Sequence, residues 1–505
     1  MKKNLFMVAA VALMAMVSCN KEEIDNGGEL QAPETPEVVE PSYFVEFTAN
    51  IPTEQAAPAP APQSVSTRTT YDATAKKTKW LEDDLISVNG KKFKIKETDG
   101  ITARFVNDEE LGGDFNPPYT AVYPYNATPG QAVVPATQTV SDGTFADESV
   151  VAAAYSANDN VLSFKHVCSV VKFTVSTAGI TELEFSSEGD IAGTINVNAN
   201  AGADPTYSVT SGSKTITVKP SGGTFSTTAT YYVSVLPTLG AADAKQKLEI
   251  KSEGVVVKSG NVRFKRTIVM DAKDITVSYT YLKPSLVWNM STPRYATYFF
   301  EGEANTWVDM TDSDNDGVYR AVIPEGYTNL IYCRMNPGKT DNNWDNKWNQ
   351  SADLKVPTTS TNAYIIGVMQ WDKGSGSWDT LNNAKSYREN AVYLKPNSNW
   401  KEKNARFAIY LCNGTQSAVW YSMTKVDDNV YGVKLPSGFD ATKYKNIIFC
   451  RMDPGNTANN WNTKWNQSGD LPCTKMTNSP YNRCCAINSG QWDCGLNVTW
   501  KTTLN

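Results

Sequence analysis

Two segments of this sequence combine tryptophan with lysine, asparagine and glutamine at a fixed spacing. The first reads CRMNPGKTDNNWDNKWNQSADL from Cys333 to Leu354, and the second reads CRMDPGNTANNWNTKWNQSGDL from Cys450 to Leu471. Sugars expose apolar C–H faces ringed by hydroxyl groups, so a sugar site needs flat aromatic surface beside polar partners. Asn and Gln each offer a donor and an acceptor, which matches a hydroxyl group. These residue types therefore predict that both segments bind a glycan.

A structural role for the same tryptophans is the alternative. A domain of about 100 residues needs several large apolar side chains to bury enough surface. The residues expected to do so in the first copy are Ile331, Tyr332, Met335 and Leu354. A core does not explain why Lys347, Asn349 and Gln350 recur between the aromatic residues, so ligand binding remains the better interpretation of the segment.

Both segments belong to a longer repeat in the C-terminal half of the chain. The motif YLKP occurs at Tyr281 and again at Tyr393. The first copy then reads RYATYFF, TWVDM and DGVYRAVIPEG, and the second reads RFAIYLC, VWYSM and DNVYGVKLPSG. Small differences in length fall between these matching stretches, as they do in loops. The pattern predicts two copies of one small β-domain, at residues 282–381 and 393–505.

The order of these motifs, with its endings NQSADL and NQSGDL, resembles a starch-binding carbohydrate-binding module of family 26. In that family two aromatic residues and a glutamine-bearing loop hold the helical face of an α-glucan on a β-sandwich. The resemblance implies the following binding residues: Tyr298, Trp307, Lys347 and Gln350 in the first copy, and Tyr410, Trp420, Lys464 and Gln467 in the second. Trp348 and Trp465 add an aromatic residue inside each loop, and they complete the candidate set.

The start of the chain has the features of an export signal. Two lysines precede an apolar run that ends in MVSC at Cys19, and a charged start followed by a short apolar stretch is typical of such signals. The ending resembles a bacterial lipobox, which implies that residues 1–18 are removed and that Cys19 is lipidated. The alternative is a secreted protein in which Cys19 is incidental. The acidic, Pro-rich stretch 19–42 is expected to be a disordered tether.

Residues 43–281 read as short strands of period two, broken by Gly, Pro and Asp. Such runs indicate antiparallel sheets, and a β-sandwich is the expected arrangement. The motifs STRTTYD, WLEDDLISV and FKHVCSVVKFTV, behind a lipobox and a tether, resemble a fimbrillin-type lipoprotein. In those pilins a trypsin-like cut after an arginine removes the first strand. Arg68 stands at the matching position, so the resemblance implies proteolytic processing there.

Charge and cysteine usage limit the partners. The formal net charge of −6 argues against nucleic acid, because phosphate binding needs a basic face. Most of the cysteines lie in the second copy of the repeat, and an exported chain can form disulfides, although sequence alone does not assign the pairs. Without paired CxxC motifs and with one histidine, structural zinc is not expected, and neither is a cofactor.

Two other motifs resemble functional sites but do not predict one. The segment DSDNDGVY, with Asp312, Asp314 and Asp316, looks like a calcium loop, but Ile323 stands where an EF-hand supplies its bidentate Glu. A hairpin turn is expected there instead. His166 is the sole histidine, and its setting in a strand predicts a structural role rather than a catalytic triad. No region has the alternating strands and helices of a barrel hydrolase, so no enzymatic activity is expected.

The sequence thus predicts an all-β protein: a fimbrillin-like β-sandwich region followed by two immunoglobulin-like β-sandwich modules. The function favoured is that of an outer-membrane lipoprotein at the cell surface that binds polysaccharide, with α-glucan as the expected ligand. The main rival is a tip or accessory subunit of a fimbria that acts in adhesion beside other fimbrial subunits. An accessory part of a glycan-degrading complex is a third hypothesis. Nucleic acid is not expected as a partner.

Overall fold

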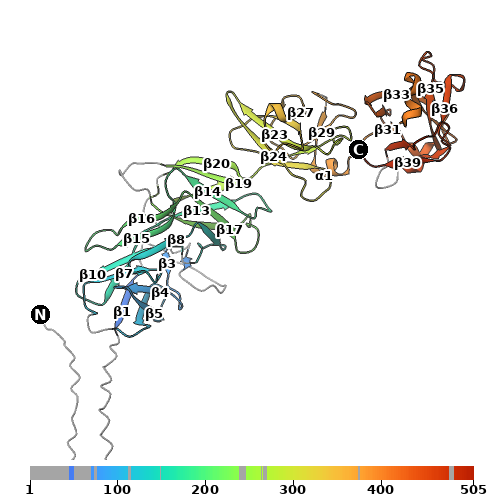
Figure 1. Ribbon diagram of the computed structural model, residues 1–505. Coiled ribbons are helices and arrows are strands. Elements are labelled where there is room, and N and C mark those ends of the chain that lie inside the picture. Colours follow the sequence, from blue (N-terminus) through green and yellow to red (C-terminus); the bar gives the residue numbers. More distant parts are fainter. Residues whose placement is uncertain are drawn as a thin grey trace, which may run out of the picture. The chain divides into compact units, whose positions relative to one another are not determined.

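The computed structural model confirms an all-β fold, with strands in every part of the chain that it describes (Figure 1). The described residues are 45–50, 70–72, 77–111, 115–147, 149–237, 246–262, 264, 270–373, 376–476 and 483–505. Cys19, Arg68 and the expected signal peptide and tether lie outside them. In the described part no helix is long and apolar enough to cross a membrane.

The first sheet of the N-terminal region has eight strands. In spatial order they are β11 (Val161–Ser163), β1 (Glu46–Asn50), β6 (Thr102–Asn107), β5 (Lys91–Thr98), β4 (Leu85–Val88), β7 (Tyr119–Tyr123), β10 (Ala152–Ser156) and β12 (Lys165–His166). Alternate side chains of a strand point to opposite faces, and in β1 Phe47 and Ala49 are buried between partly exposed neighbours. Trp80 packs in this core with its ring 5.2 Å from that of Phe105. Strands β2 (Thr70–Asp72) and β3 (Lys77–Lys79) pair with each other in a separate two-stranded antiparallel sheet.

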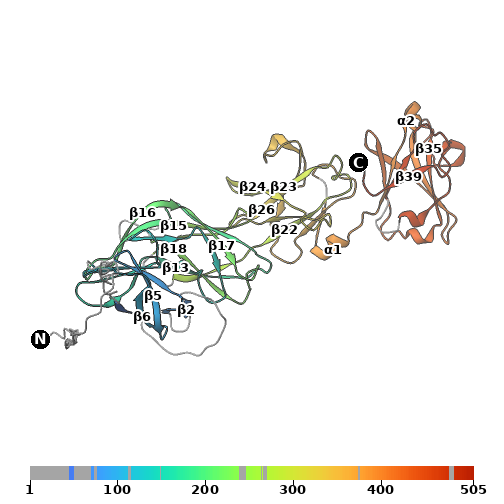
Figure 2. The same ribbon diagram turned by 60° about the horizontal axis from the view of Figure 1, so that its bottom comes forward.

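Three smaller sheets form the rest of the N-terminal region around a second core (Figure 2). One holds β18 (Thr230–Val235), β13 (Ser169–Val175) and β21 (Met270–Ile275). Another holds β20 (Val255–Val262), β19 (Gln246–Ser252), β14 (Leu183–Ser187), β17 (Thr215–Pro220) and β9 (Thr137–Val140). The last holds β16 (Thr206–Ser213), β15 (Ala192–Asn198) and β8 (Gln131–Val134). Phe173 and Phe185, from β13 and β14, meet in the shared core at 5.3 Å between ring centroids.

We expect His166 to make the stability of this region depend on pH. It ends the first sheet opposite Ala152, with Nε2 3.4 Å from the Thr78 hydroxyl. Burial lowers the pKa of the imidazole from 6.5 to about 4. The unfolded chain therefore takes up a proton at a pH where the folded chain does not, and stability that is complete above pH 6.5 is lost as the pH falls toward 4.

We expect this loss to be at most about 3 kcal/mol. Urea unfolding of the full chain at pH 7 and pH 5 should show about 2 kcal/mol of this loss, because pH 5 lies only part of the way down to 4. Hydrogen exchange in β10 and β12 gives the local readout. His166→Gln should flatten the dependence. If the variant and the parent lose protection equally between these two pH values, the histidine is not its source.

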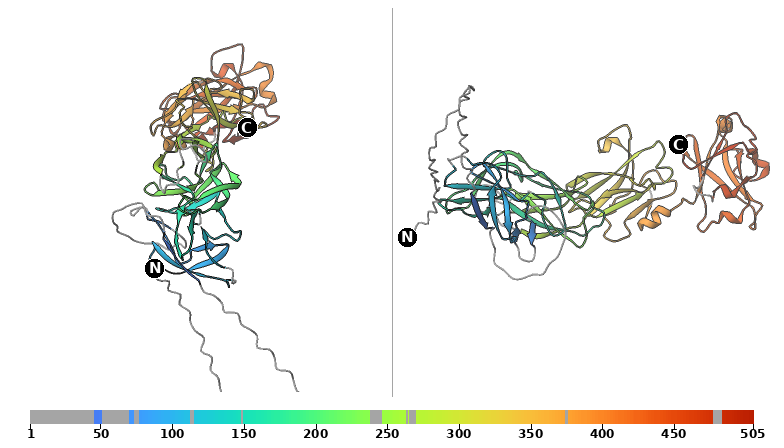
Figure 3. Two further views of the ribbon diagram at one scale, coloured as in Figure 1. Left: turned by 90° about the vertical axis from the view of Figure 1, so that its left-hand side faces the viewer. Right: turned by 90° about the horizontal axis from the view of Figure 1, so that it is seen from below.

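The first module of the C-terminal half consists of two sheets (Figure 3). One holds β25 (Tyr319–Val322), β22 (Tyr279–Lys283), β29 (Ala363–Ile366) and β30 (Gly376–Asp379). The other holds β24 (Ala304–Met310), β23 (Arg294–Glu301), β26 (Asn329–Met335) and β27 (Lys347–Gln350), and β28 (Leu354–Lys355) also pairs with β26. Trp288, Phe299 and Leu330 are buried in the core that the two sheets share. Helix α1 (Leu381–Ser386) follows, capped by Thr380, which accepts from the Asn383 backbone N–H.

The second module repeats this order of strands. Its connected strands are β36 (Lys464–Gln467), β35 (Asn446–Met452), β32 (Arg406–Cys412), β33 (Val419–Asp427), β34 (Val430–Lys434), β31 (Ala391–Lys395), β38 (Cys484–Ile487) and β39 (Val498–Lys501), and β37 (Leu471–Pro472) pairs with β35. Its helical turns are α2 (Ser398–Lys401), η2 (Glu402–Asn404), η3 (Ala441–Lys443), η4 (Trp461–Thr463) and η5 (Cys473–Met476). Trp400 is buried like Trp288, and the two indole N–H groups donate to the carbonyls of Trp492 and Trp371 respectively.

Candidate functional site

Three aromatic rings gather on the outer face of the first module. Tyr298 of β23 lies directly opposite Trp307 of β24, with 4.9 Å between the ring centroids. Trp344 belongs to the short helix η1 (Trp344–Asn346), and its ring stands 4.7 Å from Tyr298 and 5.0 Å from Trp307, edge to face with both. Trp344 remains 44% exposed. We call Tyr298, Trp307 and Trp344 the aromatic cluster of the first module.

Strand alternation places this cluster outside the core. Phe299 and Leu330 point inward and are fully buried. Tyr298 and Ile331, which are register partners, point outward beside the small side chains of Ala296 and Cys333. Because side chains alternate across a strand, each residue that fills the core leaves its neighbour free for the opposite face. The outer face is therefore apolar although no second sheet covers it in the module.

A bulge brings Lys347 and Gln350 to the same face. Gln350 lies opposite Cys333 and Lys347 opposite Met335, and the register shifts by one residue between these pairs. Residues three apart in a regular strand point to opposite faces, but an extra residue restores the same side. The Lys347 ammonium donates to the Gln350 side-chain oxygen and lies 5.3 Å from the Trp344 ring centroid. The strand edge thus adds an ammonium and an amide beside the rings.

Hydrogen bonds fix the loop that carries Trp344. Asn343 caps η1 by accepting from the Asn346 backbone N–H at 2.9 Å. Arg294 of β23 donates to the Lys339 carbonyl at 2.7 Å and to the side chain of Asn342. At the strand edge, Asp372 accepts from the Gln350 backbone N–H at 2.8 Å. A loop held at both ends presents its aromatic residue in a set position, which lowers the entropy lost when a ligand binds.

The second module builds the same arrangement. Tyr410 and Trp420 are register partners with ring centroids 4.7 Å apart. Trp461 of η4 (Trp461–Thr463) stands 4.9 Å from Tyr410 and 5.0 Å from Trp420, and it is 45% exposed. Lys464 donates to Gln467 at 2.5 Å and lies 5.5 Å from the Trp461 ring centroid. Two modules of different core sequence therefore keep one geometry on this face.

Trp348 and Trp465 lie apart from these clusters. The Trp348 ring covers the Arg334 guanidinium at 4.5 Å, and Trp371 lies 5.3 Å from the same group. Arg334 is 5% exposed and donates to the Trp288 carbonyl at 2.7 Å and to Asn349 at 3.0 Å. In the second module, by the same geometry, Trp465 covers Arg451 at 4.6 Å. These two tryptophans therefore shield a buried arginine, although each keeps an exposed edge.

Sequence reasoning missed Trp344 and Trp461 as the third ring of each cluster. Both lie in the repeated segment, and both follow an asparagine in the motif NNW. Asparagine is a favoured helix cap, and that signal could have separated the tryptophan of the helical turn from the tryptophan of the strand.

The acidic cluster in the first module is a turn closed by a lysine. Oxygens of Asp312, Asp314 and Asp316 lie within 4.8 Å of one another. The Lys385 ammonium lies 2.7 Å from Asp314 and 2.6 Å from Asp316, and Asp312 accepts from the Gly317 backbone N–H at 2.9 Å. A protein cation thus already binds two of the three carboxylates that a metal ion would need.

The described cysteines are all buried, and none of them forms a disulfide. Burial raises the pKa of the Cys333 and Cys450 thiols to about 12. Because the thiolate is the reactive form of cysteine, these two residues act as small apolar side chains beneath the aromatic clusters.

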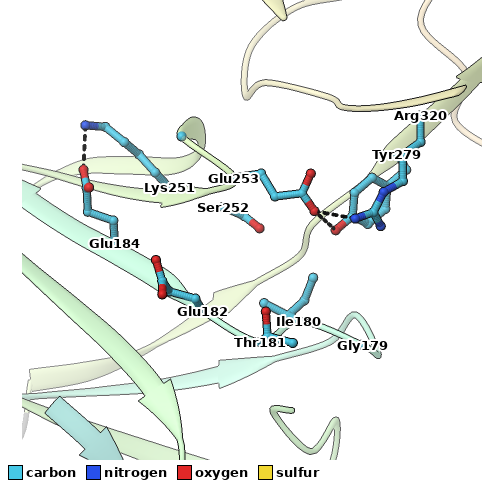
Figure 4. A pocket seen from close by; sticks show the side chains of 11 residues that line it. Gly179, Ile180, Thr181, Glu182, Glu184, Lys251, Ser252, Glu253, Tyr279 and Arg320 are labelled. Atoms are coloured by element: carbon cyan, nitrogen blue, oxygen red, sulfur yellow. Dashed lines mark hydrogen bonds and ion pairs between the residues drawn. The ribbon is translucent and has the colours of Figure 1, made fainter. Parts of the chain in front are cut away.

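A polar pocket of about 430 Å³ lies where the loop after β19 meets β22 and β25 (Figure 4). Its charged groups are paired: Glu184 with Lys251 at 3.0 Å, and Glu253 with Arg320 at 2.9 Å. The Tyr279 hydroxyl donates to Glu253 at 3.2 Å, and burial raises the pKa of this tyrosine to about 12. Of these pairs, Glu253–Arg320 joins the first module to the N-terminal region. The Tyr279 ring lines the pocket but is covered by the Arg320 guanidinium at 4.8 Å, so the pocket offers a sugar no open aromatic surface like that of the clusters.

No protein-family model matches this chain, and no curated protein is similar to it. Among solved structures, it is similar to a proposed cell adhesion protein from Bacteroides ovatus, with 17% identity, a TM-score of 0.25, and 46% of this chain and 90% of that one covered. It is similar to a fimbrial assembly protein from Parabacteroides distasonis over 56% of this chain and 100% of that one, with 11% identity and a TM-score of 0.22. The multi-modular glycogen-degrading pneumococcal virulence factor SpuA is a third, with 8% identity, a TM-score of 0.15, and 57% of this chain and 37% of that one covered. Identities and TM-scores this low do not show a family.

Proposed function

We propose that this chain binds a glycan at the cell surface, with α-glucan as the ligand, through the aromatic clusters of its two modules. The observation that carries the proposal is the repetition of one surface geometry. Each cluster joins three rings to a lysine–glutamine pair, and its outermost tryptophan is about half exposed. Partly exposed rings in both copies are costly to leave in water without a ligand.

The chemistry of each cluster fits a sugar. The ring faces offer apolar area to the C–H faces of a glucose unit. The ammonium of Lys347 or Lys464 donates to a hydroxyl, and the amide of Gln350 or Gln467 both donates and accepts. No proton transfer or covalent step is required, so the proposed activity is capture rather than cleavage.

The rest of the chain holds the two modules at the cell surface in this proposal. The N-terminal sheets act as a spacer, and the lipid on Cys19 anchors the chain to the outer membrane. Residues 282–381 and 393–505 are taken as the two binding modules. The rival proposal is a fimbrial tip or accessory subunit, for which processing at Arg68 is the deciding feature: a chain that is never shortened in cells, and whose Arg68→Ala variant behaves identically, is not such a subunit.

Affinity electrophoresis tests the main proposal. We expect the full chain without its lipid to be retarded in gels that contain starch, pullulan or glycogen, and to migrate freely in a gel with the β-glucan hydroxyethyl cellulose or without polysaccharide. Retardation should weaken when free maltoheptaose is added, because the short chain competes for the same rings. Unchanged mobility in starch, pullulan and glycogen would rule out α-glucan as the ligand.

A further inference from the structure

The two modules differ at one end of the outer face. Phe300 of β23 corresponds to Cys412 of β32, since both follow the cluster tyrosine by two residues in matching strands. Phe300 is partly buried and packs on the same outer face as Tyr298 and Trp307. Its ring stacks on that of Tyr298 with 5.8 Å between centroids and an angle of 24° between planes. The first module thus continues its row of rings where the second has a small thiol that is 5% exposed.

Phe300 extends the row away from Trp344. Lys347 lies opposite Met335, and Met335 lies opposite Arg294 at the start of β23. Phe300 stands near the far end of the same strand, opposite Asn329. Two residues along a strand advance by roughly 6.6 Å. The Phe300 ring therefore lengthens the apolar surface along β23 and can contact a different part of a ligand from Tyr298.

A second ammonium–amide pair lies beside this added ring. Lys355 of β28 faces Asn329 across the strand pair, and its ammonium donates to the Asn329 side-chain oxygen at 2.8 Å. Asn329 in turn donates to the Phe300 carbonyl at 3.2 Å. Lys355 is exposed. The end of the face at Phe300 therefore repeats the combination of ring, lysine and amide that Trp344, Lys347 and Gln350 make at the other end.

The second module keeps the amide of this combination, in Asn446, and lacks both the ring and the lysine. Pro472 occupies the register position of Lys355, opposite Asn446. The Asn446 amide donates to Asp470 at 3.0 Å, much as the Asn329 amide donates to Glu301 at 3.2 Å, so the difference at this position is the lysine. With Cys412 in place of the phenyl ring, this end of the second module offers no flat apolar surface.

We infer that Phe300, Asn329 and Lys355 form an additional sugar subsite that only the first module has. The inference rests on the proposed function: a glucan chain held by the aromatic cluster runs on along β23 and places a further glucose unit against Phe300. The first module then contacts a longer stretch of the glucan, and the second module contacts a shorter one. The repeat therefore joins two sites of unequal length rather than two copies of one site.

Calorimetry with maltooligosaccharides of increasing length tests this in the full chain. Trp420→Ala silences the second module and reports on the first, and Trp307→Ala does the reverse. The affinity of the first module should keep rising at lengths where that of the second has levelled off. In the Trp420→Ala chain, Phe300→Cys should lower the affinity for maltoheptaose about tenfold. Lys355→Ala should lower it about threefold. Lys355→Ala should leave the affinity for the shortest oligosaccharide that binds unchanged, because Lys355 lies at the end of the face away from Lys347.

Grafting provides the matched gain of function. In the Trp307→Ala chain, Cys412→Phe with Pro472→Lys should make the affinity of the second module rise with length as that of the first does. Lys355→Ala decides the matter if Phe300→Cys proves unstable, because Lys355 is exposed. Binding by both modules with the same length dependence, unaffected by these changes, overturns the subsite and leaves the proposed function intact. Absence of binding to any oligosaccharide by either module overturns both.

Discussion

Replacing Trp307 and Trp420 together by alanine is expected to abolish retention of the chain on starch. Each indole is the register partner of the cluster tyrosine and lies 5.0 Å from the exposed tryptophan of its module. Its removal takes away one ring and the support of another. Each single change should weaken binding to the polymer strongly, because two linked weak sites gain on the order of 10²–10⁴ in overall affinity when both engage one chain.

Binding of short oligosaccharides distinguishes the loss of avidity from the loss of a single binding site. On an oligosaccharide too short to reach both modules, Trp307→Ala or Trp420→Ala should remove one of two binding events in calorimetry and leave the affinity of the other unchanged. Ile101→Ala, which changes an exposed side chain of the N-terminal region, serves as the control with normal retention. If each single variant loses on starch no more than its share of sites, the modules act independently and avidity is not the reason for the repeat.

Much of the site follows from the repeat in the sequence. Tyr298 and Trp307 recur as Tyr410 and Trp420 in stretches of clear period two, and strand pairing sets each pair side by side. Local pattern also predicts β17 and β19, whose residues alternate between the core and the outside, and β13, which alternates in its second half. It predicts β18 as a strand as well, although every residue of β18 after Thr230 is buried. It does not predict that β9 lies parallel to β17, or that β11 lies parallel to β1, because those pairings depend on partners far along the chain.

Residue spacing alone does not predict which side chains of the Trp-rich segment join the aromatic cluster and which pack elsewhere. Lys347 and Gln350 are three residues apart, and a regular strand would send them to opposite faces. The bulge that reunites them leaves no signature in residue type. Trp344 and Trp348 are only four residues apart and both have polar neighbours in the sequence. A capped helical turn places Trp344 on the outer face, whereas Trp348 packs over the Arg334 guanidinium.

Arg334 is expected to be the most costly polar side chain to remove from the first module. The guanidinium is 5% exposed, and it donates to the carbonyls of Trp288 and Met290 and to Asn349. Burial lowers the pKa of Arg334, yet arginine remains charged at neutral pH. Arg334→Ala removes this donor from the Met290 carbonyl and the Asn349 side-chain oxygen, at about 1–3 kcal/mol for each, whereas the Trp288 carbonyl keeps its bond from the Tyr295 hydroxyl. The change also leaves Trp348 and Trp371 without the group that they enclose.

Hydrogen exchange in β26 and β27 of the full chain measures this cost locally. For a loss of about 3 kcal/mol, protection there should fall by roughly 100-fold. Arg451 makes the corresponding contacts in the second module, so β35 and β36 of the same variant provide an unchanged internal reference.

Trp348→Ala should show part of the same loss in protection while the Trp344 ring still binds maltooligosaccharide. Trp344→Ala should do the opposite, losing binding with protection intact, since its ring rests on the outer face and caps no buried charge. If Trp348→Ala instead removes binding and leaves protection unchanged, Trp348 contacts the sugar directly, as its place in the repeated segment first indicated, and the arginine does not depend on it.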